Sequence, residues 1–283
     1  MSQIRSLKLY STGYCTHPEK VVDPSKSLAP ISFPATVALL EHEEYGYILF
    51  DTGYASHFLD ATKQFPYSLY AKLTPVHFKE HESIVSQLQA DGISPSDIKY
   101  IILSHFHGDH TAGLLDFPQA TILTFSTAYE DVKRRSKFSA LTKGCLLDTL
   151  PVDIEKRMVF LDKQPSVERE DFQGFSTGYH VLNDTSLYVV SLPGHATGQF
   201  GVIVTLGSGK QVFLCADAVW TSHAFKELCY PHKIAHLLLA DAQAYRETLH
   251  RLHHFSRLYP VIDILPTHCH VTWNKAKEGY IYE

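Results

Sequence analysis

Three histidines and one aspartate occur within six consecutive positions of this chain, directly after a short apolar segment. Residues 98–103 read Ile-Lys-Tyr-Ile-Ile-Leu and are rich in β-branched side chains, which is typical of a buried strand. Residues 105–110 then read His-Phe-His-Gly-Asp-His. The chain must therefore fold so that the end of one strand delivers several metal-binding side chains to the edge of a sheet.

The spacing within this cluster favours two metal ions. His105 and His107, two positions apart in an extended segment, project to the same side and can chelate one ion. Gly108 permits a sharp turn, so Asp109 and His110 can point toward a second ion about 3.5–4 Å away, the usual spacing of two-metal sites. Imidazole and carboxylate ligands suit zinc, and also iron or manganese, because no thiolate lies in the cluster. The alternative, structural histidines beside a helix cap, is disfavoured by this density of ligand-type residues.

Strand-like and helical segments alternate around the cluster. The segment 54–78 is rich in aromatic residues and contains two prolines, which predicts a loop or short helices that either line an apolar substrate pocket or pack as a flap on the core. Residues 136–179 have weak periodicity and predict an irregular insertion with a short strand at 158–161. The remaining predictions are strands at 7–10, 35–40, 47–50, 121–125, 187–192, 200–206, 211–214 and 261–265. Helices are predicted at 82–90, from 111, at 126–135 with Ser126 as N-cap, and at 241–257 with Asp241 as N-cap.

Three strands of the second half are each followed by a candidate ligand. These residues are His195, Asp217 and His268. Taken singly, they read as a structural histidine, a helix cap and a loop residue. Residues 105–110 alone cannot complete the coordination spheres of two metal ions. We therefore predict that His195, Asp217 and His268 supply the remaining ligands. His270 is an alternative to His268, which we favour because it comes first after its strand.

Other polar residues near strand ends have plainer alternatives. Asp51, at the end of strand 47–50, forms either a simple turn or a carboxylate that holds a metal-bound histidine in its tautomer. His223, His232 and His236 follow Asp217 along the chain and either face the groove or lie at the surface, of which we favour the surface. Cys269 is expected to be a small buried thiol.

Composition excludes several classes of partner. The formal net charge is −5, and Lys133-Arg134-Arg135 is the only tight basic cluster, so no nucleic acid is expected. The first ten residues lack a signal-peptide pattern and no apolar run reaches about 18 residues, so we predict a cytoplasmic protein with no membrane partner. The five cysteines are scattered and form no CxxC pair, which argues against a disulfide framework and a thiolate zinc site.

These motifs resemble the five motifs of the metallo-β-lactamase superfamily. The resemblance rests on residues 50–53, 105–110 and 193–195 and on Asp217 and His268, and it extends from about residue 7 to residue 268. Within that superfamily, the chain is most similar to the group of N-acyl homoserine lactone lactonases. The resemblance implies an α/β fold, an αββα sandwich of two mixed sheets flanked by helices. It also implies a single domain, 1–283, with pseudo-repeat halves at about 1–135 and 180–283.

The resemblance also implies which residues bind two zinc ions. The first ion would be held by His105, His107 and His195, the second by Asp109, His110 and His268, and Asp217 would bridge the two. One departure is clear, because these lactonases usually have a tyrosine three residues after the bridging aspartate, where this chain has Trp220. An indole cannot supply the acidic hydroxyl of a phenol.

The function implied is a zinc-dependent hydrolase with quorum-quenching lactonase activity. A hydroxide between the two ions would attack a lactone or ester carbonyl, with Asp109 and Asp217 as the catalytic carboxylates. The substrate is expected to be a small molecule with an apolar moiety, and the protein is expected to form a homodimer. Alternatives on the same scaffold are a thioesterase of the glyoxalase II type, a phosphodiesterase or a β-lactamase, and a different class is a catalytically silent metal-binding sensor. A β-lactamase is disfavoured by the missing export signal and by aspartate at position 217.

Overall fold

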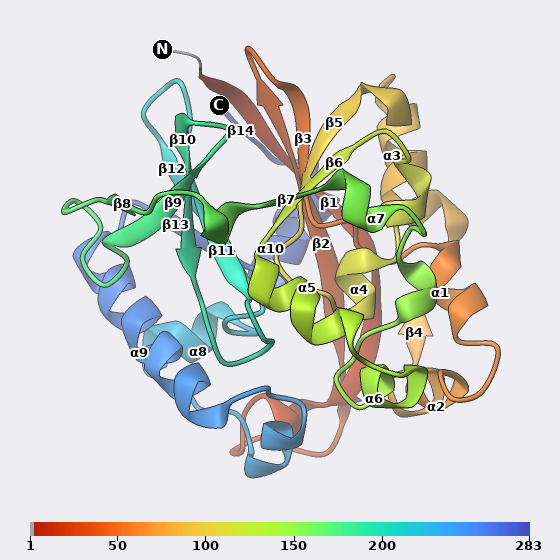
Figure 1. The fold of residues 1–283 in the computed structure, drawn as a ribbon. Helices are drawn as coiled ribbons and strands as arrows, with labels where there is room; N and C mark the ends of the chain where they lie inside the picture. Colours follow the sequence, from red (N-terminus) through yellow and green to blue (C-terminus); the bar gives the residue numbers. More distant parts are fainter. Residues whose placement is uncertain (1–2) are drawn as a thin grey trace.

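Two β-sheets lie face to face and helices cover their outer faces, as the computed structural model shows (Figure 1). This arrangement confirms the predicted sandwich of two mixed sheets flanked by helices. The structure describes residues 3–283, so the first two positions of the expected domain 1–283 lie outside the described residues. Within the described range, no helix is both long and apolar enough to cross a membrane.

The first sheet has the strand order β14-β1-β2-β3-β5-β6-β7, and the short strand β4 pairs with β1. Its strands β1, β2 and β3 are antiparallel, whereas β3, β5, β6 and β7 are parallel. The strands are β1 (Ile4–Pro18), β2 (Pro30–His42), β3 (Gly46–Phe50), β4 (Val76–His77), β5 (Ile98–Ile102), β6 (Thr121–Thr124), β7 (Met158–Phe160) and β14 (Ile281–Tyr282).

The second sheet has the strand order β13-β12-β11-β10-β9-β8. Strands β12 and β13 are parallel, and the other neighbours are antiparallel. The strands are β8 (Val167–Glu168), β9 (Thr177–Val181), β10 (Asp184–Ser191), β11 (Phe200–Thr205), β12 (Gln211–Ala216) and β13 (Asp263–Pro266).

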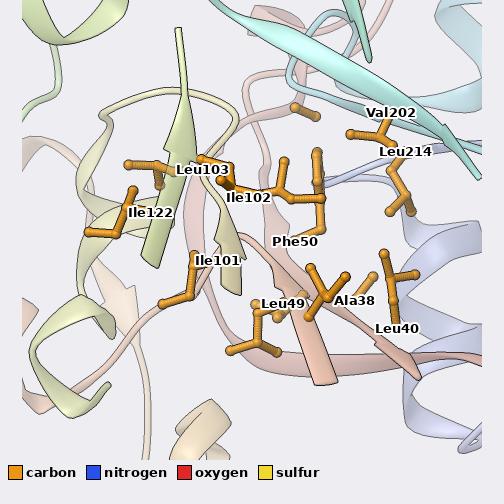
Figure 2. Close-up of a cluster of buried hydrophobic side chains, with 14 of the residues drawn as sticks. Ala38, Leu40, Leu49, Phe50, Ile101, Ile102, Leu103, Ile122, Val202 and Leu214 are labelled. Carbon is orange, nitrogen blue, oxygen red and sulfur yellow. The ribbon is translucent and has the colours of Figure 1, made fainter. Parts of the chain in front are cut away.

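The main core lies between the two sheets. Phe50 and Ile102 from the first sheet and Val202 and Leu214 from the second belong to one buried cluster (Figure 2). Strand β11 is buried on both faces, since Val202 belongs to this cluster while the next residue, Ile203, packs with the outer helices. Such a strand reads as a continuous apolar run rather than as an alternating one, which is why residues 200–206 are recognisable from sequence.

Helices α8 and α9 lie beside the second sheet, and α1, α3 and α4 lie beside the first (Figure 1). The long helix α9 begins as predicted, because the Asp241 carboxylate accepts hydrogen bonds from the backbone N–H groups of Gln243 and Ala244 at 2.9 and 3.0 Å. The helices are α1 (Ser56–Ala61), α2 (Ser68–Leu73), α3 (Ile84–Ala90), α4 (Gly108–Thr111), α5 (Ser126–Lys133), α6 (Lys137–Leu141), α7 (Ile154–Arg157), α8 (Ser222–Glu227), α9 (Ala242–Leu258) and α10 (His270–Lys277).

Two local predictions around the cluster are wrong. The helix expected from residue 111 begins instead at Gly108, directly after the extended residue His107. Gly108 is needed for packing, because a Cβ atom at this position would lie 2.9 Å from Leu146 Cδ1. Ser126 is not an N-cap, because Phe125 holds that position and the Ser126 backbone and hydroxyl donate to the Asp162 carboxylate at 2.7 and 2.8 Å.

The insertion 136–179 is more ordered than its sequence predicts. It contains α6 and α7, and it adds β7 to the edge of the first sheet and β8 to the edge of the second. The predicted strand at 158–161 corresponds to β7. The insertion therefore contributes to both sheets, although its short elements carry too few residues to show a clear period.

Candidate metal centre

Four strand ends deliver the predicted ligands to one edge of the sandwich. His105 follows β5, His195 follows β10, Asp217 follows β12 and His268 follows β13. His107 is the N-cap residue of α4, and Asp109 and His110 lie in its first turn. All of these except His107 are buried, so the cluster is largely shielded from water.

Backbone residues in strained conformations lie at or next to the carboxylates of Asp51 and Asp217. Asp51 has φ 62° and Ala216, just before Asp217, has φ 49°, both in the left-handed region that non-glycine residues rarely adopt. Gly194 has φ 129°, and a Cβ atom on it would lie 2.2 Å from Tyr245 Cα. The turn that carries His195 can therefore pack against α9 only with glycine at this position.

The first group of donor atoms comes from His105, His107, His195 and Asp217, and these atoms all lie within 4.8 Å of one another. The Nε2 atom of His195 lies 3.0 Å from Nδ1 of His107 and 3.2 Å from Oδ2 of Asp217. The Nε2 atom of His105 lies 3.9 Å from the same carboxylate oxygen. Side chains separated by as many as 112 positions in the sequence thus converge on one point.

The second group comes from Asp109, His110 and His268, whose donor atoms also lie within 4.8 Å of one another. The Nε2 atoms of His110 and His268 lie 3.8 and 3.5 Å from Oδ2 of Asp109. Asp217 reaches into this group as well, with Oδ2 2.8 Å from His268 Nε2 and Oδ1 3.5 Å from His110 Nε2. Its carboxylate therefore lies between the two groups.

Three of the imidazoles are oriented by a contact at Nδ1, the ring nitrogen that is not one of the converging donor atoms. His110 Nδ1 lies 2.8 Å from Oδ2 of Asp51, His105 Nδ1 lies 2.9 Å from Oγ of Ser104, and His268 Nδ1 lies 2.7 Å from the carbonyl oxygen of Pro34. The Nε2 atoms of these three histidines consequently face the centre of the cluster. This is the arrangement by which neighbouring groups fix the tautomer of a metal-binding histidine.

Burial and neighbouring charges shift the pKa values of the cluster in opposite directions. Burial holds the pKa values of His105 and His107 well below the usual histidine value, which keeps both imidazoles neutral. Burial also opposes charge on His268, but Asp217 outweighs it and raises the pKa of His268 to about 9. The surrounding histidines in turn hold the pKa of Asp217 well below its usual range despite burial. The pocket thus keeps a buried carboxylate ionised and favours positive charge beside it.

Several of the donor atoms are not satisfied by hydrogen bonds among themselves. The buried atoms His105 Nε2, His110 Nε2 and Asp217 Oδ1 have no hydrogen-bond partner, although buried polar atoms are nearly always paired. Neutral imidazoles and ionised carboxylates are the forms that bind a divalent cation. Unpaired donors that converge in a buried site therefore fit two metal ions. His270 is exposed and its Nε2 donates to the carbonyl oxygen of Ser32 at 2.9 Å, so it points away from the cluster that His268 joins.

A cavity of about 430 Å³ opens beside the cluster, and His107, Asp109, His195, Asp217 and His268 form part of its lining. Much of the remaining lining is apolar or aromatic. These residues are Cys15, Val21, Phe33, Tyr54, Leu69, Tyr70, Leu73, Phe138, Leu141, Trp220 and Leu238, together with the polar His17, Thr74, Thr142 and Lys143. The segment 54–78 thus lines a pocket, while its Phe58 and Tyr67 are buried as a packed flap would be.

Several lining residues have no sequence signal. His17 and Phe33, on the long strands β1 and β2, form an edge-to-face pair with ring centroids 5.4 Å apart. Phe138 and Leu141 belong to α6 of the insertion, and Leu238 follows a 3₁₀-helix in an irregular segment. None of these residues lies at a recognisable motif spacing, and only the aromatic richness of 54–78 indicates a pocket.

Comparison with known protein families gives one match over most of the chain. Residues 32–252 match the model described as the metallo-beta-lactamase superfamily. An N-acyl homoserine lactonase AttM of Rhizobium radiobacter is 29% identical over 155 residues, which is 54% of this chain and 54% of that protein. The match thus spans about half the length of that relative. The N-acyl homoserine lactonase AiiA of Bacillus thuringiensis subsp. kurstaki is 26% identical over 227 residues, which is 79% of this chain and 80% of that protein.

Solved structures show the same fold. An N-acyl homoserine lactone hydrolase with the product N-hexanoyl-L-homoserine at its catalytic metal centre superposes with a TM-score of 0.72 at 21% identity, covering 96% of both chains. AidC, described as a dizinc quorum-quenching lactonase, superposes with a TM-score of 0.60 at 16% identity, covering 95% of this chain and 91% of its own. At these identities the likeness establishes the architecture alone.

Proposed function

The chain belongs to the metallo-beta-lactamase superfamily, and from this we propose that it is a metal-dependent hydrolase that opens a lactone or ester bond. The observation that carries the proposal is the convergence of seven potential ligands, several with unpaired buried donor atoms, on the wall of a largely apolar cavity. A structural metal site would have no need of a cavity of this size beside it.

The proposed ligands follow the two groups of donor atoms. His105, His107 and His195 would hold one ion, Asp109, His110 and His268 would hold the other, and Asp217 would contribute to both. Nitrogen and oxygen donors of this kind suit zinc, with iron or manganese as the next choices. Ions bound here supply Lewis-acid polarisation of a carbonyl oxygen and make water acidic enough to react at neutral pH.

The side chains of this protein then orient, shield and move protons. Asp51, Ser104 and the Pro34 carbonyl fix three imidazoles, so little reorganisation is needed during the reaction. Asp109 lines the cavity, 3.5 Å from His268 Nε2, where its carboxylate can accept a proton and return it to the departing alkoxide. Asp217 is almost inaccessible to solvent, so its role is to hold the centre together.

Trp220 occupies the place where the resemblance predicts a tyrosine, and its indole packs edge-to-face with His195 and Phe33. Two phenols lie on the cavity wall instead, those of Tyr54 and Tyr70. Tyr54 is buried next to Cys15, whereas Tyr70 is partly exposed. Burial and the nearby Asp109 raise the pKa of Tyr70 well above its usual value, so this phenol stays protonated and can donate to a substrate oxygen. We therefore assign to Tyr70 the role of the missing phenol.

The substrate class follows from the shape and polarity of the cavity. Its apolar walls suit an alkyl or acyl chain, and its polar end lies at the metal centre, where a carbonyl would bind. N-acyl homoserine lactones have both parts, and the curated relatives in two bacterial genera are named for acting on them. A small-molecule lactone with an acyl chain is accordingly the substrate we propose.

The test is hydrolysis by the purified, metal-loaded protein across four substrate classes: N-acyl homoserine lactones of several chain lengths, aryl esters, a thioester and a bis-aryl phosphate. We expect the highest kcat/KM for lactones, rising with acyl length until the cavity is filled. A preference for the thioester or the phosphate diester would replace the lactonase proposal with that activity. An absence of turnover on every substrate, with two ions bound, would indicate a sensor.

A further inference from the structure

A second set of metal-ligand side chains lies outside the centre described above. It consists of Asp23, His223 and Cys229, whose donor atoms all lie within 4.8 Å of one another. Among residues 3–283, it is the one cluster of three such residues that the centre does not use. His223 is exposed and the other two are partly exposed, so an ion could enter from solvent. The scattered positions explain why no sequence spacing points to it.

Three separate pieces of chain bring these residues together. Asp23 follows the 3₁₀-helix η1 (Glu19–Val21) in the connection between β1 and β2, and its carboxylate is fixed by the backbone N–H and hydroxyl of Ser25 at 2.9 and 2.7 Å. His223 lies in the first turn of α8. Cys229 follows α8 after Leu228, whose φ of 52° turns the chain so that the Cys229 N–H donates to the carbonyl oxygen of Ala224 at 3.0 Å.

The donor set has the chemistry of a zinc site. Thiolate, imidazole and carboxylate are all ligands of zinc, and three protein ligands leave a fourth position for water. The Cys229 sulfur lies within 4.8 Å of an Asp23 carboxylate oxygen, so a divalent cation bound between them would take the place of the thiol proton. The alternative, a cysteine nucleophile served by histidine and aspartate, is disfavoured because partial burial and Asp23 raise the pKa of the thiol. The nearby Lys26 favours the thiolate but is too weak to reverse that shift.

We propose that Asp23, His223 and Cys229 bind a divalent ion of the zinc class, which clamps the β1–β2 connection to α8. The clamp would act next to the cavity wall, since Val21, two residues before Asp23, lines the cavity. The Val21 carbonyl oxygen also accepts a hydrogen bond at 3.0 Å from the His232 N–H, which begins the 3₁₀-helix η7 (Lys233–Leu237). The ion would therefore stiffen one side of the substrate cavity without touching the reacting atoms.

Cobalt(II) titration of the purified full-length protein tests this site independently of catalysis. A thiolate ligand gives a thiolate-to-cobalt charge-transfer absorption in the near ultraviolet, whereas the proposed catalytic ligands include no thiolate. We expect wild type to develop this absorption and to saturate with one thiolate-bound ion per chain. Cys229→Ser should abolish it. The matched control Cys15→Ser, which alters the cysteine that lines the cavity, should retain it.

Metal content provides the second readout. Cys229→Ser and His223→Ala should each bind one ion fewer per chain than wild type by elemental analysis, while His107→Ala should keep the cobalt–thiolate absorption even if hydrolysis is lost. The proposal is overturned if folded wild type develops no charge-transfer absorption at saturating cobalt. Persistence of that absorption in Cys229→Ser, or its loss in Cys15→Ser, would overturn it equally. None of these outcomes depends on which substrate the enzyme cleaves.

Discussion

The Oδ2 atom of Asp51 lies 2.8 Å from the Nδ1 atom of His110, so a carboxylate at the end of β3 orients an imidazole on α4. The same carboxylate accepts hydrogen bonds from the backbone N–H and the hydroxyl of Ser104 at 2.8 and 2.9 Å. Both residues are fully buried, with Asp51 1% and His110 0% exposed. One side chain therefore connects three segments that converge on the metal centre.

Asp51→Asn keeps the shape of this side chain but removes its charge and one acceptor for His110. We expect metal affinity or kcat to fall about 10–100-fold, the usual effect of removing the partner of a metal-binding histidine. Elemental analysis after dialysis, together with kcat/KM, measures the change. The matched control is Asp116→Asn. It alters an aspartate outside the metal centre, whose Oδ1 atom lies 2.8 Å from His57 Nε2. Equal effects in the two variants would contradict the role of Asp51.

His107→Ala removes a proposed ligand without changing a strand. We expect turnover to fall by at least about 100-fold, since a ligand contributes more than its hydrogen-bonding partner does. The far-ultraviolet circular dichroism should stay that of wild type. The control His254→Ala, at an exposed position on α9, should be unaffected. Wild-type activity and metal content in His107→Ala would show that the ligand assignment is wrong.

Removal of metal should destabilise the fold as well as stop catalysis. Without ions, His105 Nε2, His110 Nε2 and Asp217 Oδ1 stay buried and unpaired. At a metal concentration 100-fold above Kd, binding contributes about 2.7 kcal/mol, which corresponds to a change in Tm of about 5–10 °C. Thermal denaturation before and after chelation measures this difference. Addition of zinc, iron(II) or manganese in turn identifies which ion restores both activity and Tm.

Tyr70→Phe tests the proposed phenol donor. Loss of a single donor to a developing oxyanion costs about 10²-fold in kcat, and we expect that loss with little change in metal content. Tyr45→Phe is the control, because the Tyr45 hydroxyl donates to the Leu182 carbonyl oxygen at 2.9 Å, away from the cavity. An unchanged kcat in Tyr70→Phe would leave Tyr54 as the donor to examine next.

Asp184→Asn should change the dependence of stability on pH. Burial opposes ionisation of Asp184, but hydrogen bonds from Ser186 and the contact with His42 at 3.1 Å outweigh it and lower its pKa. Because the pKa of Asp184 is lower in the folded protein than in the unfolded chain, its ionisation stabilises the fold. This stabilisation is complete above the unfolded-state pKa of about 3.9 and is lost as the pH falls through the folded-state pKa.

We therefore expect Asp184→Asn to lose about 1–3 kcal/mol of unfolding free energy at pH 7, because a buried charge-assisted contact is removed. Near pH 3 the difference from wild type should be smaller. Urea denaturation at both pH values measures this, and Asp153→Asn, half exposed, serves as the control. A difference that stays constant with pH would show that packing, rather than charge, is responsible.

The residues that the structure brings together could be selected from the sequence because they follow strands with clear apolar patterns. His195, Asp217 and His268 each come directly after such a strand, and strand ends of one sheet meet at a common edge. His105 and His107 are recognisable because they lie two positions apart, a spacing that places both side chains on the same side of an extended segment. Their association in space is a finding of the structure, whereas their binding of ions remains a prediction.

Other features depend on tertiary contacts that no local pattern encodes. The close packing of Gly108, at the start of α4, against Leu146 joins residues 38 positions apart. The Asp162 carboxylate that binds Ser126 comes from the insertion, so Ser126 reads as a cap until that contact is known. Short elements such as β8 have two residues, too few to show any period.

Part of the cavity wall comes from short helices that contribute no proposed metal ligand. The proposed ligands lie at strand ends and on α4, whereas Leu69, Leu73 and Phe138 of the wall come from short helices and are 37%, 77% and 57% exposed. Replacement of such exposed side chains costs little folding free energy. Evolution or an engineer could therefore change which substrates the proposed hydrolase accepts by altering these positions alone, and leave the proposed metal ligands untouched.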